Sequence, residues 1–336
     1  MSLTSVDTNP VTEFGNLREE FSAITSGCAV CDLEWRAKIS VTGEDRTRWL
    51  NGMVTNNIRD LAIGHGVYAF QLNPQGHILG DLYAYNRGDF LTLDTGQPQV
   101  KTLISTFDHY IIMDDVQVKD ASQELAAIGV VGPNSIETLR AAKFDVPELE
   151  PLQLADLDWN GSTVTLVRTD MPGVPEYELW YSPANSPQIH GALIKAGAKP
   201  VRAAALELLR VAQGVPRYGQ DIRERDLPQE TGQQRALHFS KGCYIGQEIV
   251  ERIRSRGSVH RAFVGFGIDG PLPAPGTRIQ ADGKEVGEIT SVVEIPTEST
   301  KRAVALGYIR RDFAAPGTIV QAGSARLSIE SLPFAG

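Results

Sequence analysis

Apolar and polar positions alternate along most of the chain with the two periods that are typical of helices and strands. Phe14, Leu17, Phe21 and Ile24 recur at helical spacing, which predicts an amphipathic helix over residues 13–26. Further helices are predicted over residues 44–53, 98–112, 133–143, 186–196 and 201–213. Strands are predicted over residues 37–41, 68–72, 77–85, 152–159, 162–169 and 177–181.

Two turns join neighbouring strands into hairpins. The run from Asn73 through Pro74 and Gln75 to Gly76 separates the first pair, and Asn160-Gly161 separates the second. Beyond about residue 260, short strands alternate with Pro-Gly, Asp-Gly and Ala-Gly breaks, which predicts a small closed β unit. Strands and helices do not alternate as in a doubly wound sheet, so an α+β fold is expected.

Composition agrees with a globular protein of 336 residues, 42% hydrophobic and 22% charged, and this length predicts two or three domains. The net charge of −9 argues against a broad nucleic-acid interface, which needs clustered positive charge. No stretch approaches the roughly 20 apolar residues of a membrane span, and the first residues lack the apolar core of a signal peptide. Three cysteines form no disulfide framework, so a reduced, cytoplasmic location is expected.

The run Lys-Gly-Cys-Tyr-Ile-Gly-Gln-Glu, from Lys241 to Glu248, is the most informative stretch of the sequence. A thiolate is favoured by a nearby cation, so Lys241 is expected to lower the pKa of Cys243 if the loop curls back. Gly242 and Gly246 allow the backbone to come close to a ligand. The alternative is a tight structural turn with a half-buried thiol.

Cys28 and Cys31 form a Cys-x-x-Cys pair, but no second pair supplies the further ligands of a zinc site. Both are predicted to pack in the core, since free cysteine is among the most buried residue types. The six histidines show no metal-ligand spacing, so no metal site is expected.

The wider pattern around the cysteine, residues 208–253, together with residues 39–85, resembles the YgfZ-type folate-binding family. That family is related to the glycine cleavage T-protein, an aminomethyltransferase. The resemblance implies a three-domain, aminomethyltransferase-like cloverleaf around a central opening, with a small C-terminal β-barrel domain. The expected divisions are 1–145 for an N-terminal α+β folate-binding domain, 146–255 for a second α+β domain carrying the cysteine run, and 256–336 for the barrel.

Tetrahydrofolate, or a derivative of it, is the cofactor that the resemblance implies, bound between the first two domains. The segment 168–181 looks like the T-protein segment that supplies the pterin-binding glutamate, which places that role on Glu178. Strand alternation would put Glu176, Glu178 and Trp180 on one face, with Tyr177 and Leu179 on the other. The alternative is a solvent-facing glutamate on a strand edge. The other residues expected to bind folate are Tyr68, Asn73, Tyr244, Gln247, Arg252 and Arg254.

Two departures from the T-protein pattern bear on catalysis. T-proteins carry an Asp-Asp pair after the hairpin, whereas this chain has Gly80-Asp81, so Asp81 joins Cys243 and Lys241 as a candidate catalytic residue. Leu206 stands where a T-protein arginine meets the folate tail. If the run after the cysteine is extended, Arg252, Arg254 and Arg256 share one face and replace that cation. The alternative is a charged edge strand.

Three functions follow from these residues. The resemblance implies a folate-binding protein that supports assembly or repair of iron–sulfur clusters in other enzymes, including tRNA-modifying ones, with Cys243 as the functional thiol. Its partners would be iron–sulfur client or assembly proteins, without direct contact to nucleic acid or membrane. The alternatives are a folate-dependent aminomethyltransferase of glycine cleavage and a non-catalytic interaction scaffold. These residues leave open whether the protein turns over a substrate.

Overall fold

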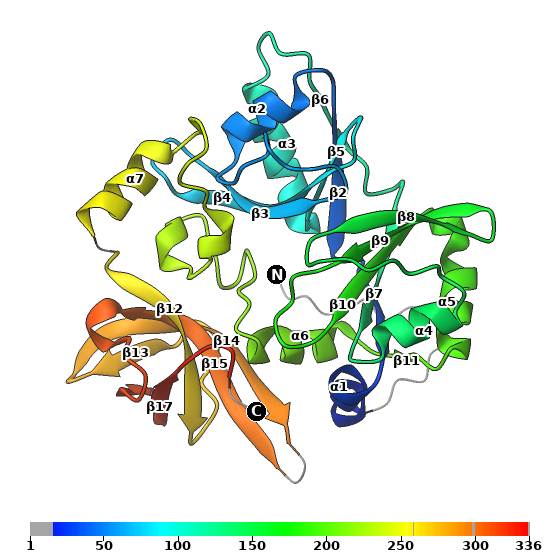
Figure 1. Cartoon of the computed structure of the whole chain (residues 1–336). Helices are drawn as coiled ribbons and strands as arrows, with labels where there is room; N and C mark the ends of the chain where they lie inside the picture. Colours follow the sequence, from blue (N-terminus) through cyan, green and yellow to red (C-terminus); the bar gives the residue numbers. More distant parts are fainter. Residues whose placement is uncertain (1–15, 258, 298–299, 335–336) are drawn as a thin grey trace.

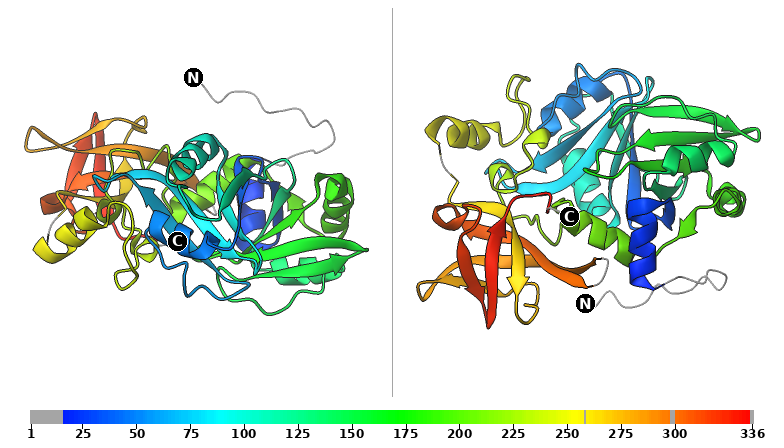
Figure 2. Two further views of the ribbon diagram at one scale, coloured as in Figure 1. Left: turned by 90° about the horizontal axis from the view of Figure 1, so that it is seen from above. Right: turned by 60° about the horizontal axis from the view of Figure 1, so that its bottom comes forward.

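The computed structural model describes residues 16–257, 259–297 and 300–334. Its strands form a five-stranded sheet, a six-stranded sheet and a closed barrel, which lie at the corners of a triangle in Figure 1. The three units lie side by side in one flattened layer in Figure 2. The α+β class and the C-terminal barrel are therefore as the sequence predicts.

The five-stranded sheet has one apolar and one polar face. Its order is β3 (Gly66–Leu72), β4 (Ile78–Asn86), β5 (Leu91–Gly96), β2 (Arg36–Thr42) and β6 (Gln117–Asp120). Ile39, Leu82 and Leu93 pack on one side against α2 (Arg46–Met53) and α3 (Val100–His109), through Trp49 and Leu103. Because side chains alternate along a strand, the polar residues between these apolar ones face the other way.

The six-stranded sheet is covered by helices on one face. Its order is β11 (Lys199–Pro200), β1 (Ala29–Asp32), β7 (Ala126–Val131), β10 (Glu176–Tyr181), β9 (Ser162–Arg168) and β8 (Leu154–Trp159). Tyr177 and Leu179 of β10 share a core with Leu139 of α4 (Ser135–Ala141) and with Ile189 and Leu193 of α5 (Ser186–Lys195). This packing fixes which face of β10 is left for the polar side chains.

The barrel closes through β12 (Arg261–Asp269), β15 (Lys301–Arg310), β14 (Lys284–Pro296), β13 (Arg278–Ala281), β16 (Ile319–Ala322) and β17 (Ala325–Glu330). A buried polar network ties it to α6 (Ala203–Ala212), which also packs against α1 (Leu17–Ser26). Asp221, fully buried, accepts hydrogen bonds from Arg210 Nη1 at 2.6 Å and from Ser291 Oγ of β14 at 2.7 Å. Moving the barrel away from α6 would leave a buried charge without its partner, which is costly. The network therefore holds the barrel against α6.

The predicted helices and strands are confirmed, with shifts of a few residues at their ends. Residues 13–15 of the first predicted helix lie outside the described residues. The sequence reading missed β1, β5, β6, β7 and the two-residue strand β11. β7 lies between two other strands and is apolar on both faces, so it shows no alternation. β6 is a short edge strand with mostly exposed residues, so it lacks an apolar pattern.

The division of the chain at residues 145 and 255 stays a prediction. The two open sheets interleave along the sequence, since β1 and β7, both before residue 145, belong to the same sheet as β8, β9 and β10. The barrel strands run from Arg261 to Glu330. Within the described residues, no helix is long and apolar enough to cross a membrane.

Candidate functional site

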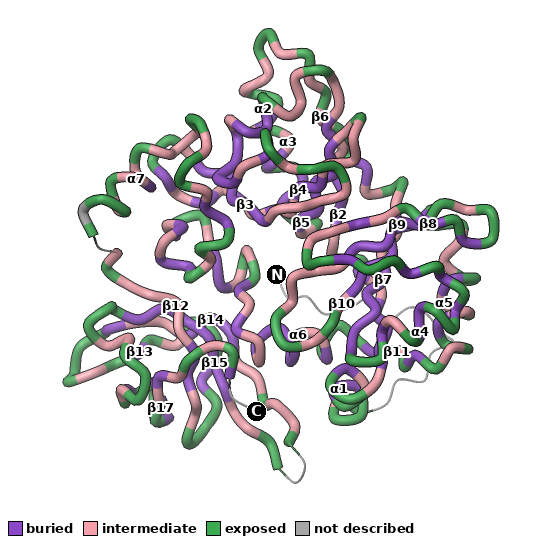
Figure 3. The backbone as a smooth tube through the Cα atoms, in the orientation of Figure 1, coloured by how far each residue is buried: buried purple, intermediate pink, exposed green. Residues whose placement is uncertain are grey.

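The polar faces of the two open sheets come together around one strand, β10. Glu176, Glu178 and Trp180 lie on the face of β10 opposite Tyr177 and Leu179, as alternation predicts. Figure 3 shows that β10 and β3 are largely buried. The expected pterin-binding glutamate is therefore not a solvent-facing residue on a strand edge, because Glu178 is only 8% exposed.

Glu178 is held by a neighbour on its own strand and by a cation from the other sheet. Trp180 Nε1 donates to Glu178 Oε2 at 2.6 Å, and Lys38 Nζ of β2 lies 3.8 Å from the same oxygen. Burial, and then the negative charge of Asp94, raise the pKa of Glu178, while Lys38 works in the opposite direction. The carboxyl group of Glu178 is thus a buried hydrogen-bond acceptor, and Lys38 alone does not fully neutralise its charge.

A buried ion cluster on the five-stranded sheet supports this glutamate. Lys38 Nζ donates to Asp94 Oδ1 at 2.6 Å, and Arg36 also pairs with the Asp94 carboxylate. Although burial acts to raise it, the pKa of Asp94 is lowered by the charges of Arg36 and Lys38. Lys38 and Asp94 are cross-strand neighbours on β2 and β5, so the sheet register itself brings them together.

Glu176 is a second carboxyl group on the same face of β10. Its Oε2 accepts a hydrogen bond from Thr169 Oγ1 at 2.9 Å. Burial, and then repulsion from Glu178, raise the pKa of Glu176 to about 7. Two carboxyl groups with raised pKa values on one strand make this face a candidate site for a ligand rich in hydrogen-bond donors.

Aromatic rings from both open sheets lie on these polar faces. The ring of Tyr85 meets Trp180 edge-on with 5.3 Å between centroids, and the rings of Tyr68 and Tyr83 are 4.9 Å apart. Lys38 Nζ lies 4.2 Å from the centroid of Trp180. Flat apolar walls with a few fixed polar groups are typical of small-molecule sites.

Asp81, in β4, lies on the polar face of the five-stranded sheet and is fixed by two hydrogen-bond donors. Tyr68 OH donates to Asp81 Oδ2 at 2.7 Å, and Gln99 Nε2 donates to Asp81 Oδ1 at 2.8 Å. A Cβ atom at Gly80 would stand 2.8 Å from Leu103 Cδ2 and 3.0 Å from Gln99 Oε1. The packing of Leu103 and Gln99 therefore leaves no room for a second aspartate at position 80 without rearrangement.

Lys241 does not curl back toward Cys243, which corrects the expectation drawn from their spacing. Its Nζ donates to the carbonyl oxygens of Asn51, Val54 and Asn56 at 2.5, 2.6 and 2.7 Å, at the C-terminal end of α2. Burial, and then repulsion from Arg59, lower the pKa of Lys241 to about 7. The three carbonyl acceptors nevertheless match the three N–H donors that only the ammonium form carries, so the geometry is that of the ammonium form.

Cys243 is exposed, in contrast to Cys28 and Cys31, which are buried as predicted. Gly246, with φ of 82°, begins the next helix, and a Cβ atom there would lie 2.7 Å from the carbonyl oxygen of Asn73. Gly246 thus allows its own segment to lie close against the hairpin turn between β3 and β4. The segment carries an exposed thiol and contacts that turn at Gly246.

Two of the residues expected to bind folate, Asn73 and Gln247, hold the local backbone. Asn73 Oδ1 accepts from the amides of Gln75 and His77 at 3.0 and 2.9 Å, which closes the hairpin turn. Gln247 Oε1 accepts from the amide of Tyr244 at 3.1 Å, at the start of the helix. Tyr244 packs beside the cluster that contains Tyr68.

The run after the cysteine is a helix, α7 (Gln247–Arg256), and not an extended segment. Residues two apart on a helix do not share a face, so the expected row of arginines does not form. Arg252 and Arg254 are exposed, with the Arg254 guanidinium 4.4 Å from the centroid of Phe239. In Figure 1, α7 lies on the opposite side of the molecule from β10. The side chain of Arg256 lies outside the described part of the structure.

The sequence reading missed Arg36, Lys38, Asp94 and Arg235, which complete the polar face. Lys38 and Asp94 each occupy a position of an otherwise apolar strand that alternation assigns to the polar face. This pattern predicts a polar face, but it does not predict that the two side chains are buried. Among the described residues, no group of three or more His, Cys, Asp or Glu side chains is arranged to hold a metal ion.

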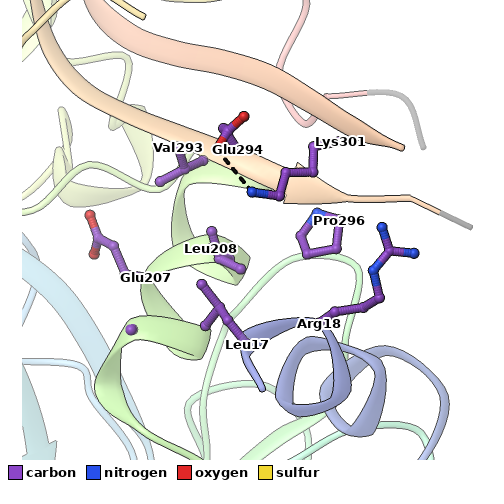
Figure 4. Close-up of a pocket in the computed structure, with 9 residues that line it drawn as sticks. Leu17, Arg18, Glu207, Leu208, Val293, Glu294, Pro296 and Lys301 are labelled. Atoms are coloured by element: carbon purple, nitrogen blue, oxygen red, sulfur yellow. Dashed lines mark hydrogen bonds and ion pairs between the residues drawn. The ribbon is translucent and has the colours of Figure 1, made fainter. Parts of the chain in front are cut away.

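A separate cavity of about 340 Å³ lies between α1, α6 and the strands β14 and β15, away from β10 (Figure 4). Leu17, Leu208, Val293 and Pro296 supply its apolar wall. Lys301 Nζ pairs with Glu294 at 3.2 Å on its edge. The residues expected to bind folate do not line it.

Similarity to known proteins extends over nearly the whole chain. Residues 10–241 match the GCVT N-terminal domain, and residues 261–330 match the glycine cleavage T-protein C-terminal barrel domain. An aminomethyltransferase of Geobacillus kaustophilus is 28% identical over 92% of this chain and 86% of its own length. A putative chloroplastic transferase of Arabidopsis thaliana is 26% identical over 93% of this chain and 72% of its own length.

The fold is shared with a solved structure, the glycine cleavage system aminomethyltransferase T from Bartonella henselae. The two superpose with a TM-score of 0.86 over 95% of this chain and 89% of the other, at 20% identity. The matches to both domains, together with this fold, show that the chain belongs to the aminomethyltransferase-like glycine cleavage T-protein family, including its C-terminal barrel.

Proposed function

We propose that this protein binds a reduced folate, tetrahydrofolate or a derivative of it, against the polar face of β10. The observation that carries the proposal is the pair of carboxyl groups, Glu176 and Glu178, on a largely buried strand beside Trp180. The pyrimidine ring of a reduced pterin is flat and presents an amino group and a ring N–H donor along one edge. A buried carboxylate between aromatic walls satisfies both properties.

We further propose that the protein acts in the manner of the YgfZ-type branch, supporting iron–sulfur cluster assembly or repair in other enzymes, including tRNA-modifying ones. The run from Lys241 to Glu248 supports this, since its cysteine is exposed while the other two are buried. An exposed thiol is available to a partner protein, whereas a buried one is inert. Cys243 is the residue that would carry this role.

Folate binding is tested by calorimetric titration of the purified protein with tetrahydrofolate. Glu178→Gln removes a charged acceptor, and a hydrogen bond to a charged group contributes about 1.5–3 kcal/mol, so the affinity should fall by about 10- to 100-fold. Glu148→Gln is a matched control, because Glu148 is exposed. An unchanged affinity in Glu178→Gln would remove this glutamate from the site. No binding by the unaltered protein would favour the non-catalytic scaffold.

The thiol is tested in cells that lack the native protein. Cys243→Ala should leave folding intact, since an exposed side chain contributes little packing, but abolish the support of iron–sulfur enzyme activity. Ser240→Ala alters an exposed neighbour in the same loop and should complement fully. Full complementation by Cys243→Ala would remove the thiol from the mechanism.

Aminomethyl transfer is the second candidate function, favoured by the names of similar proteins such as that of Geobacillus kaustophilus. Gly80 counts against it, because one acid of the expected pair is missing and its neighbours fill the space. General acid–base assistance is typically worth 10²–10⁴-fold in rate. Release of ammonia and methylenetetrahydrofolate from an aminomethyl-lipoyl carrier should therefore be slow, and robust turnover would establish the transferase instead.

A further inference from the structure

Arg235 projects from the segment before the cysteine run onto the aromatic wall of the site. It lies in a short 3-10 turn, η4 (Gln234–Ala236), and its guanidinium carbon is 4.4 Å from the centroid of the Tyr68 ring. The same carbon lies 5.8 Å from the centroid of Tyr83, and Arg235 Nη2 is 3.4 Å from Tyr83 OH. A cation is thus placed on the polar face of the five-stranded sheet, beside Asp81 and Tyr68.

Its ion-pair partner is Asp170, which follows β9 in the other sheet. The side chain of Arg235 is 35% exposed and that of Asp170 is 17% exposed, so a ligand in solution can reach the pair. Asp170 also accepts a hydrogen bond from Tyr83 OH at 3.2 Å. The aspartate therefore keeps a donor if the arginine turns to another carboxylate.

The candidate site holds two separate groups of charges near one tyrosine. The guanidinium carbons of Arg36 and Arg235 each lie 5.8 Å from the centroid of Tyr83. Arg36 belongs to the cluster with Asp94 and Glu178, whereas Arg235 pairs with Asp170. A ligand with donors at one end and a carboxylate at the other matches this layout.

The other positions considered for the folate tail are placed less well. Leu206 packs beside the apolar cluster that joins α1 and α6. Arg254 stacks on Phe239 in the exposed helix α7 and pairs with Glu251 at 3.5 Å. Arg36 pairs with Asp94. Arg235 and Arg36 both contact the aromatic wall and both share their carboxylate partner with a second donor, but the side chain of Arg235 is 35% exposed and that of Arg36 is 21% exposed. Arg235 is therefore the more accessible of the two cations.

We propose that Arg235 receives the carboxylate tail of the bound folate, by exchanging Asp170 for a carboxylate of the ligand. The proposal rests on the proposed folate binding and names the group that recognises the tail. Arginine suits this exchange because its planar fork holds a carboxylate with two parallel hydrogen bonds. The guanidinium has a carboxylate partner before and after the exchange, and Asp170 keeps the hydroxyl group of Tyr83 as a hydrogen-bond donor.

The test compares tetrahydrofolate with 6-methyltetrahydropterin, which has the same reduced ring but no tail. Arg235→Gln should weaken tetrahydrofolate binding about tenfold and leave the affinity for 6-methyltetrahydropterin unchanged. Arg254→Gln, the same substitution on α7, should bind both as the unaltered protein does. Asp170→Asn removes the competing charge and retains the acceptor for Tyr83 OH, so it should bind tetrahydrofolate several-fold more tightly.

The outcomes separate the inference from the function on which it rests. If the unaltered protein binds both ligands and Arg235→Gln weakens both equally or neither, the tail assignment is overturned while folate binding stands. If the unaltered protein binds neither ligand, both are overturned. Asp170→Asn provides an independent arm, because it does not alter Arg235 itself. A loss of tetrahydrofolate affinity in that variant would also contradict the exchange.

Discussion

Replacing Lys241 with methionine should loosen the loop that carries Cys243. The side chain of Lys241 caps α2 from a distant part of the chain, through the carbonyl oxygens of Asn51, Val54 and Asn56. The last carbonyls of a helix have no partners within it, so a cation placed there satisfies them and interacts favourably with the helix dipole. Methionine retains most of the volume but none of the donors.

The magnitude follows from what is lost. A hydrogen bond to a charged group contributes about 1.5–3 kcal/mol, and a cation at a helix C-terminus adds about 0.3–1 kcal/mol. Desolvation of the ammonium, visible in the lowered pKa of Lys241, offsets part of this. We therefore expect a loss of about 2 kcal/mol, which increases the equilibrium for local opening of the loop about 30-fold.

Two backbone amides report this opening directly by hydrogen exchange. The amide of Ile245 donates to the carbonyl of Gly52 at 3.2 Å, and that of His238 donates to the carbonyl of Thr55 at 3.1 Å. Both should exchange about 30-fold faster in Lys241→Met. Lys195→Met, at an exposed position in the last turn of α5, is the control and should change neither. Unchanged exchange at Ile245 in Lys241→Met would refute the capping role.

Three further predictions concern a carboxyl group, the thiols and a glycine. Because burial raises the pKa of Glu176 from 4.5 to about 7, its contribution to stability is present below about pH 4.5 and lost as pH rises through 7. Relative to Glu176→Gln, the unfolding free energy of the unaltered protein should fall by about 1–3 kcal/mol between pH 5 and 8 in urea titrations. Cys243 should be alkylated faster than Cys28 or Cys31, as measured by peptide mass spectrometry, since burial raises the pKa of Cys31 to about 12. Gly80→Asp should destabilise the protein by about 1–3 kcal/mol in the same titrations, because its Cβ would contact Leu103 and Gln99.

Each of these three predictions would be contradicted by a specific result. A pH dependence that is the same in Glu176→Gln would mean that another group titrates in that window. Equal alkylation rates at the three cysteines in the folded protein would contradict the difference in burial. A Gly80→Asp variant as stable as the unaltered protein would show that Leu103 and Gln99 yield at little cost.

The sequence alone determined most of the elements and the fold class. Apolar periodicity and hairpin turns are local properties, and they place β3, β4, β8, β9 and β10 within a few residues. Alternation also placed Glu178 and Trp180 on one face of β10, because side chains of a strand point to alternate sides. The exposed thiol of Cys243 agrees with its polar, glycine-flanked surroundings in the sequence.

Only the tertiary structure decided what each polar side chain contacts. Two residues that are adjacent in a motif can be turned apart, and Lys241 is directed to the end of α2 rather than to Cys243. Lys38, Asp94 and Glu178 come from three separated strands, and their cluster depends on sheet register and on the packing of one sheet against the other. Burial and close charged neighbours, which shift the pKa values of Asp94 and Glu178, are properties of that packing and have no counterpart in the local sequence.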